Sequence, residues 1–246
     1  MTPPASAVSS SAPSRVPAPL VALLAPDVGM PRVARESKAR WALLFAMVCA
    51  LSLSGMQAMR VDAHAETLQE LEMTGQLKDM SDRQVEDQAK AADRKFIVKT
   101  VAASIFRPPL LCLVYLVSLY ILAWFLRGRS QGGQMSAVAG AALIPSAVSD
   151  LLSAGAVWMH STIETHGPPL IPRTLNQILA HFGHSISGPL APLGNALDLF
   201  SLWSALLLGF GLATAANLSR RSAVIASLVA WTLWRLLLAC AFHLGG

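Results

Sequence analysis

Five apolar segments, each long enough to cross a lipid bilayer, constrain the fold of this chain more than any other feature. They lie at about residues 41–59, 105–126, 135–159, 198–216 and 223–243. A membrane-spanning helix needs about 20 mostly apolar residues at 1.5 Å rise each. The sequence therefore predicts an all-α, polytopic transmembrane helical bundle of five spans, and hence an integral membrane protein.

The composition supports this class and narrows the choice of partners. Hydrophobic residues make up 54% of the chain and charged residues only 13%, whereas about a quarter of the residues in a soluble domain are charged. The net charge of +5 would suit a nucleic-acid partner. Because the basic residues flank the apolar segments, however, they are better explained as orientation signals that also contact anionic headgroups. We therefore expect membrane lipids as partners and no nucleic acid.

Residues 1–40 contain seven prolines among Ala, Ser and Val and show no helical or strand periodicity. Such a composition predicts a disordered tail, followed by a membrane domain over residues 41–246. Four basic residues precede the first span and place the tail in the cytoplasm, namely Arg32, Arg35, Lys38 and Arg40. Ala63-His64-Ala65 after that span resembles a signal cleavage site. An uncleaved anchor is preferred, because signal peptides normally begin the chain.

The loops between the apolar segments carry an uneven distribution of charge. The two short loops hold the basic pairs Arg127/Arg129 and Arg220/Arg221 without acids, whereas the connection 160–197 has Arg173 as its only Lys or Arg. Because basic residues in short loops set orientation most strongly, five spans with a cytoplasmic N-terminus and an exoplasmic C-terminus are predicted. The Ala-rich composition suits a bacterial inner (plasma) membrane.

The connection between the first two spans predicts an extramembrane amphipathic helix. Ser81 to Gln84 form a capping box, and apolar positions then recur at steps of three and four residues, at Val85, Ala89, Ala92 and Phe96. This helix is either a solvated connector, which is the simpler interpretation, or a surface that lies on the membrane or the bundle. Pro108-Pro109 is predicted to mark the turn at which the chain goes into the bilayer.

Two apolar segments carry a charged residue well inside them, and another segment opens with one. Asp150 lies roughly 22 Å along span three and Arg235 roughly 20 Å along span five, which runs in the same direction. Asp198 opens span four from the opposite side. Since an unpaired charge in the membrane costs at least about 2.5 kcal/mol, Asp150, Arg235 and Asp198 are predicted to form a pair or triad. It either fixes the helices together or lines a transport path, and the scarcity of further acids favours the first interpretation.

Small residues recur every four positions along span four, at Ser201, Ala205, Gly209 and Ala213. Such a stripe lets helix backbones approach closely, and close packing is the preferred interpretation over a cavity. In span three, Pro145 is predicted to kink the helix below Asp150.

Four histidines fall in the connection after span three, at His160, His166, His181 and His184, with Glu164 as the nearby carboxylate. This is a weak pattern for a metal site. The sequence contains no phosphate-binding glycine loop, nucleophile elbow or zinc-protease motif. We therefore expect no metal, no cofactor and no catalytic residues.

The order of these parts resembles the Ypt-interacting protein (Yip) domain family, in particular its bacterial branch. The features that carry the likeness are the helix before Pro108-Pro109, the turn Arg127-Gly128-Arg129, the span with Pro145, and Asp198-Leu199-Phe200-Ser201-Leu202-Trp203 followed by Gly209-Phe210-Gly211. The resemblance implies a five-span bundle with a cytoplasmic N-terminus, and it brings no catalytic residues. Eukaryotic members are linked to vesicle traffic and small GTPase partners, a role that does not extend to the bacterial branch.

The leading expectation is thus a non-enzymatic Yip-type membrane protein that organises or binds membrane components through its bundle and its 60–104 connection. Its protein partner and oligomeric state are left open. The alternative is a small transporter or channel-like protein that uses Asp150, Asp198 and Arg235. A metal-binding protein or enzyme that uses the loop histidines is the third possibility.

Overall fold

The chain folds almost entirely into helices. The computed structural model describes residues 17–36, 39–60, 80–129, 131–160, 170–184, 186–188 and 191–244. Over these ranges there is no strand, and one isolated antiparallel bridge joins Thr174 to Asp198. The all-α prediction is confirmed.

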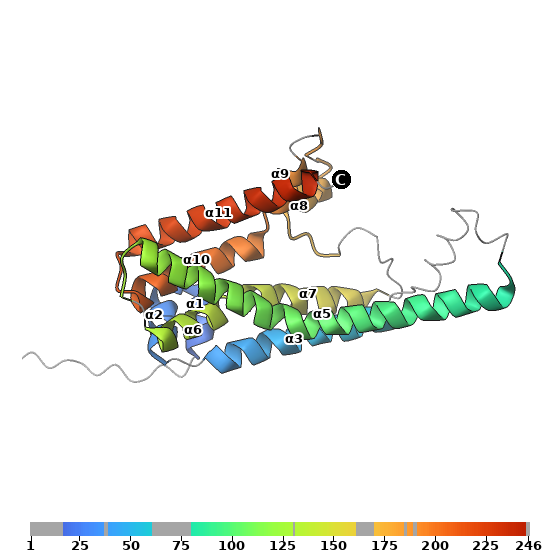
Figure 1. Ribbon diagram of the computed structural model, residues 1–246, viewed down its shortest axis with the longest axis horizontal. Coiled ribbons are helices and arrows are strands. Elements are labelled where there is room, and N and C mark those ends of the chain that lie inside the picture. The colour runs from blue at the N-terminus through green and yellow to red at the C-terminus, as the bar shows by residue number, and fades with distance from the viewer. Residues whose placement is uncertain are drawn as a thin grey trace, which may run out of the picture.

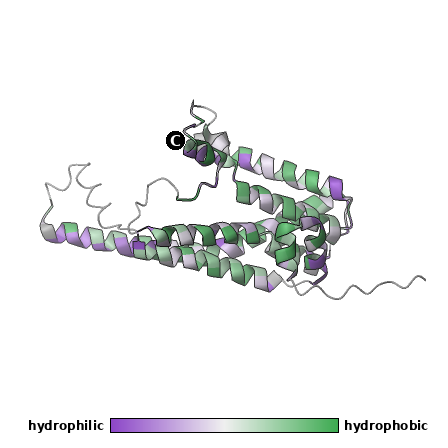
Figure 2. Cartoon of the chain, turned by 180° about the vertical axis from the view of Figure 1, so that it is seen from behind, coloured by the Kyte–Doolittle hydropathy of each residue, from purple (hydrophilic) through white to green (hydrophobic). Residues whose placement is uncertain are grey.

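Four of the predicted spans are long and apolar enough to cross a membrane. They correspond to α3 (Ala39–Arg60), the C-terminal part of α5 (Asp82–Phe125), α6 (Gly132–Ala141) together with α7 (Ile144–Met159), and α11 (Arg220–Leu244). The remaining predicted span is α10 (Leu199–Ala215), an apolar helix of only 17 residues. Figure 1 shows these helices side by side, and Figure 2 shows that hydrophobic residues dominate their length.

The third span is the most buried of the four. Its most apolar stretch is 72% buried, against 11% for α11. The span divides at Ala142–Leu143, so that Pro145 lies in the first turn of α7, where a missing backbone N–H leaves no intrahelical bond unmade. The predicted interruption of span three near Pro145 is therefore confirmed. The buried part of this span consists of α6 and the first half of α7.

α5 runs without a break from Asp82 through Pro108 and Pro109 to Phe125, so the predicted turn at the two prolines is wrong. Its first turns extend beyond the neighbouring helices (Figure 1). Prolines are tolerated inside a membrane helix where neighbouring helices and hydroxyl side chains support the backbone. Here α3 and α6 both pack alongside α5.

The start of α5 has the predicted capping interaction, since the Ser81 N–H donates to Gln84 Oε1 at 2.9 Å. The predicted apolar positions are the buried or half-buried ones, at Val85, Ala89, Ala92 and Phe96. The opposite face is solvated and carries the Glu86–Lys90 ion pair. The helix is therefore amphipathic as predicted, but it continues directly into the second span.

Residues 17–36 form two helices rather than the predicted disordered tail. These are α1 (Ala18–Leu24) and α2 (Pro26–Glu36), and the side chains of Ala22 and Met30 are fully buried. A Cβ on Gly29 would collide with the main chain of Ala22, so α2 lies directly against α1. The prolines do not prevent helix formation where they fall in a first turn, as Pro26 does. Residues 1–16 of the predicted tail lie outside the described residues.

The two short loops lie together at one end of the bundle. The N–H of Arg129 donates to the carbonyl of Ala216 at 3.0 Å. Gly128 packs so closely on Ala216 that an added Cβ would lie 2.8 Å from the Ala216 side chain. We call this end, formed by the loops 126–131 and 216–219 with α1 and α2, the turn end. Its Arg-bearing loops share one side, as the charge pattern predicted.

Two short helices, α8 (Leu175–His181) and α9 (Ala191–Ala196), lie at the opposite end of α10 and α11 and pack on each other. α9 also packs against α11. Two backbone hydrogen bonds join this region to the start of α10, from Leu175 to Leu197 at 2.8 Å and from Leu199 to Arg173 at 3.1 Å. We call this end, formed by α8, α9, the end of α7 and the start of α10, the cap end.

Candidate functional site

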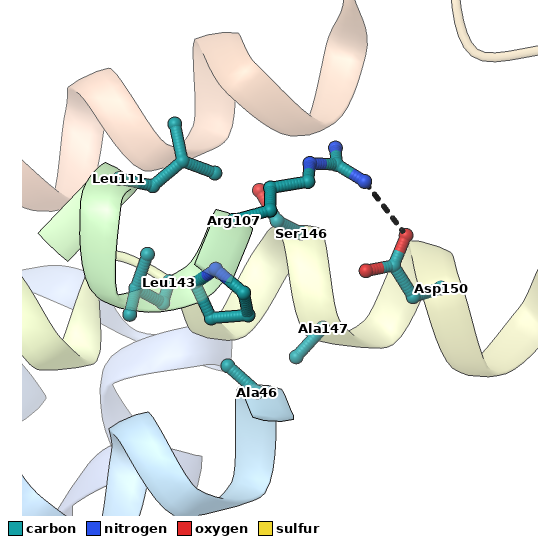
Figure 3. Close-up of a pocket in the computed structure, with 8 residues that line it drawn as sticks. Ala46, Arg107, Leu111, Leu143, Ser146, Ala147 and Asp150 are labelled. Carbon is teal, nitrogen blue, oxygen red and sulfur yellow. Dashed lines mark ion pairs between the residues drawn. The ribbon is translucent and has the colours of Figure 1, made fainter. Parts of the chain in front are cut away.

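Asp150 of α7 is the most buried charged residue of the described chain, with 5% of its surface exposed. Its Oδ1 atom lies 3.2 Å from Nη2 of Arg173 and 3.8 Å from Nη1 of Arg107. Figure 3 shows Arg107 reaching from α5 towards the Asp150 carboxylate. The carboxylate is thus paired with two guanidinium groups from different parts of the chain.

Arg173 is held in place before it reaches Asp150. Its carbonyl accepts the N–H of Leu199, and its own N–H donates to Gln177 Oε1 at 2.9 Å. Its Nη2 atom also donates to Ser153 Oγ at 2.8 Å and to the Ser149 carbonyl at 3.3 Å. Because guanidinium groups have several donors in a fixed plane, this one arginine joins the segment before α8 to two successive turns of α7.

Asp198 has two roles at the start of α10. Oδ1 accepts the backbone N–H groups of Phe200 at 2.8 Å and Ser201 at 3.2 Å, which makes Asp198 the N-cap of the helix. Oδ2 lies 3.8 Å from Nη2 of Arg235 on α11. The Arg235 guanidinium also lies 5.9 Å from the centre of the Trp231 ring. Asp198 therefore fixes the helix start and its contact with α11 together.

Of the three residues expected to share a cluster, the structure joins Arg235 to Asp198 and gives Asp150 other partners. The expected Asp150–Arg235 pair does not form, because α11 packs against α10 while α7 packs mainly against α3. Equal depth in two parallel helices does not make them neighbours. The bridge between Thr174 and Asp198 nevertheless places both ion clusters at the cap end.

The sequence analysis missed Arg107 and Arg173 as partners, although both left a signal. Arg107 and Asp150 lie about equally far, roughly 19 residues, on either side of the loop 126–131, and residues equidistant from a tight loop between antiparallel helices lie at one level. Arg173 is the only Lys or Arg in the connection 160–197. A buried acid needs a partner, and this loop contains a single arginine that could provide it.

The space beside Asp150 is small. A cavity of about 10 Å³ is lined by Arg107, Ser146, Asp150 and apolar side chains that include Leu111 and Leu143 (Figure 3). A cavity needs about 10–15 Å³ of this kind of volume to hold one water molecule. The buried Ser149 hydroxyl nearby has no hydrogen-bond partner among the described residues. The arrangement pairs charges between helices and leaves space beside Asp150 for about one water molecule.

The stripe of small residues on α10 faces α11 at three of its four positions. Ser201 Oγ accepts from Trp231 Nε1 at 3.2 Å, and the Ala205 carbonyl accepts from Ser227 Oγ at 2.7 Å. A Cβ on Gly209 would lie 2.7 Å from the Cα of Val224. Ala213 is half-buried against the core. These contacts are those of close helix packing rather than of a cavity lining.

The loop histidines are only partly described. His166 and Glu164 lie outside the described residues, whereas the rings of His160 and His184 lie within hydrogen-bond distance of the nearby carbonyls of Ala156 and Phe182. Among the described residues no three His, Cys, Asp or Glu side chains form a group that could hold a metal ion.

Together the fold and the charge clusters define a helical integral membrane protein whose buried charges pair between its helices and its cap loop. The Yip1 domain family model matches residues 21–242, nearly the whole chain, and the protein therefore belongs to the Yip1 domain family. The matched region begins within α1 and so includes α2, which the predicted domain boundary at residue 41 left out. No curated protein and no solved structure matches the chain.

Proposed function

We propose that the protein is a non-enzymatic Yip-type membrane protein that organises or binds other membrane components. The observation that carries this proposal is the pairing of Asp150 with Arg107 and Arg173 beside a cavity of only about 10 Å³. A transport path needs hydrated space next to its charged groups, whereas charges that tie helices together need partners and little water. The geometry at Asp150 is of the second kind.

The contact surface for a protein partner, in this proposal, is the N-terminal half of α5. Its first turns extend beyond α3 and α7 (Figure 1), and it is rich in hydrophilic residues (Figure 2). Two apolar side chains on it are exposed, Ile97 at 43% and Val98 at 67%. A helix that combines charged and apolar exposed positions is suited to bind another helix, because its backbone is already folded before binding.

The proposed topology has five spans, with the N-terminus cytoplasmic and the C-terminus exoplasmic, in a bacterial inner membrane. α10 serves as the fourth span in chain order, and its 17 residues extend about 25 Å, near the lower limit of about 17 residues for a spanning helix. The turn end carries the basic loops and would face the cytoplasm.

Cysteine labelling from either side of the membrane tests this topology. After replacement of Cys49, Cys112 and Cys240, a cysteine introduced at Ser219 should be labelled from the inside and one introduced at His184 from the outside.

Site-specific photo-crosslinking tests the partner role. A photoreactive residue at Val98, on the exposed face of the N-terminal half of α5, should give discrete protein adducts in native membranes. The matched control is Leu237 on α11, which is exposed to a similar extent, 65% against 67% for Val98, and should yield lipid adducts only. Protein adducts of equal strength at both positions would reject α5 as the contact surface.

The alternative is a small transporter or channel-like protein with Asp150, Asp198 and Arg235 along its path. Reconstituted liposomes distinguish the two, since the organiser predicts ion and proton leakage equal to that of empty liposomes. A flux that requires the native protein and is lost on Asp150→Asn would replace the proposal.

A further inference from the structure

The turn end contains a hollow that none of the roles above uses. It has a volume of about 470 Å³ and lies between α2, the loop 126–131, α6 and the end of α10. Its lining is mostly polar: Arg35, Arg129, Gln131, Gln134, Thr214, Ala215 and Asn217. This volume falls in the range of about 300–1,000 Å³ typical of small-molecule sites. We propose that the hollow binds a phosphate group, either in the headgroup of an anionic glycerophospholipid or as a free phosphate compound.

The charge of the lining favours an anion. Arg35 and Arg129 bring two guanidinium groups to the hollow, and the lining has no carboxylate. Within the described part of the chain neither arginine forms an ion pair, although Arg220 at the same end is paired with Asp27 at 3.3 Å. Guanidinium groups bind phosphate oxygens through paired, charge-assisted hydrogen bonds. Two such groups in one hollow without a competing acid fit a phosphate.

The neutral side chains of the lining complete the recognition of phosphate oxygens. Gln131, Gln134 and Asn217 have amide groups and Thr214 a hydroxyl group, all of which can donate hydrogen bonds. The Arg129 backbone is fixed by its hydrogen bond to Ala216. The uncapped start of α6 adds a small positive field to the two arginines. The hollow therefore holds donors from three parts of the chain around one space.

The position of the hollow favours a lipid as the source of the phosphate. The neighbouring end of α5 carries two strongly exposed aromatic residues, Trp124 at 80% and Phe125 at 75%. Exposed aromatic residues at the ends of spans lie at the level of the lipid headgroups. The phosphate of an anionic lipid in the same leaflet would be at the height of Arg129, and its acyl chains could follow the apolar surface of α5.

The test uses the full-length protein in nanodiscs of phosphatidylcholine doped with phosphatidic acid, and measures retained lipid by native mass spectrometry. The pocket variant is Arg35→Gln with Arg129→Gln. Its matched control is Arg127→Gln with Arg221→Gln, which removes the same charge from exposed arginines of the same end that do not line the hollow. The pocket variant should lose about tenfold or more in phosphatidic acid affinity, as expected for two charge-assisted contacts, and the control should lose less than about twofold.

Free phosphate is examined in a second arm, with inorganic phosphate added to the same nanodiscs. If millimolar phosphate does not displace the lipid, the lipid headgroup is the source. If it does displace the lipid, and phosphate binding is lost in the pocket variant, the same site takes small anions. Equal losses of phosphatidic acid affinity in the pocket and control variants would overturn the proposal, since binding would then depend only on the overall surface charge of this end.

A conservative variant separates binding from folding. Arg35→Lys with Arg129→Lys keeps both charges but removes the planar donor groups, and it should bind more weakly than the native protein yet more strongly than the glutamine variant. Thermal unfolding of all three variants should match that of the native protein within about 2 °C. A glutamine variant that unfolds as the native protein does and binds phosphatidic acid unchanged would also overturn the proposal.

Discussion

The two ends of the bundle are held together by different interactions. At the cap end, buried Asp150 pairs with Arg107 and Arg173, and half-buried Asp198 pairs with Arg235. At the turn end, the ion pair between Asp27 and Arg220 is half exposed, with 48% and 53% of the side-chain surfaces accessible. There the helices are joined by close packing instead, as where Gly29 meets the main chain of Ala22. The same type of charge pair is therefore expected to contribute differently to the stability of each end.

Burial accounts for this difference. Exposed ion pairs contribute about 0–1 kcal/mol because water and salt screen them. Removal of one partner from a buried pair costs about 3–5 kcal/mol, because the other charge is left without compensation. Close packing has no such dependence on charge and is disrupted by added volume. The cap end should thus be sensitive to loss of charge, and the turn end to added volume.

The largest effect is expected from Asp150→Asn at the cap end. The substitution keeps the shape of the side chain but leaves Arg173, which is 25% exposed, without its carboxylate. We expect a loss of about 3 kcal/mol in the free energy of unfolding, measured by thermal unfolding in detergent or nanodiscs. A loss below about 0.5 kcal/mol would mean that the Asp150 site is hydrated, and the distinction between the ends would disappear.

A double-mutant cycle checks which arginine is the partner. Asp150→Asn combined with Arg173→Gln should show a coupling energy of about 1–3 kcal/mol. The control cycle combines Asp150→Asn with Arg235→Gln, and its coupling should be near zero because these side chains have separate partners. A stronger coupling in the control cycle would instead support the pairing first expected from their depth in the membrane.

The second largest effect is expected at the turn end, from Gly29→Val. A Cβ at Gly29 meets the main chain of Ala22, whereas a Cβ at Gly155 of α7 meets nothing within 4 Å. Gly29→Val should therefore cost about 2 kcal/mol through displacement of α1 from α2. Gly155→Val should change the stability by less than about 0.5 kcal/mol. Equal effects would show that the N-terminal helices do not pack as described.

The sequence predicted the features that depend on local composition. The length and hydropathy of each segment gave the four long spans, and Ser81 with Gln84 gave the start of α5. The basic residues of the two short loops predicted that both loops lie at the same end of the bundle. Each of these properties is encoded within about 20 consecutive residues, because a spanning helix satisfies its own backbone hydrogen bonds.

The features that the sequence did not predict depend on distant partners. α1 and α2 are short and rich in proline, and they are stabilised by packing that involves α6 and α10, which lie more than 90 residues further along the chain. The partner of Asp150 could not be derived from depth alone, because depth does not tell which side of a helix faces which neighbour. Arg173 contacts Asp150 from a loop that a backbone bridge joins to the start of α10, and that bridge links residues distant in the sequence.

Effects no larger than that of Gly29→Val are expected at the second ion cluster of the cap end, between Asp198 and Arg235. Arg235→Gln should cost about 1 kcal/mol, because both side chains are about one quarter exposed and lie 3.8 Å apart. Asp198→Ala should cost about 2 kcal/mol, since it also removes the N-cap of α10. Asp198→Asn, which keeps a capping side chain without the charge, should resemble Arg235→Gln. If it resembles Asp198→Ala instead, charge rather than capping governs this site.

The smallest effect is expected from Asp27→Asn at the turn end, with a loss below about 0.5 kcal/mol because the ion pair with Arg220 is half exposed. Arg220→Gln should cost slightly more, since the Arg220 guanidinium also lies 4.7 Å from the centre of the Phe210 ring.

Raising the salt concentration should remove the effect of Asp27→Asn and leave that of Asp150→Asn nearly unchanged, because salt screens exposed charges far more than buried ones. Thermal unfolding at low and high salt measures both. A salt-independent loss at Asp27 as large as that at Asp150 would show that ion pairs hold both ends alike, and burial would then no longer explain the difference between them.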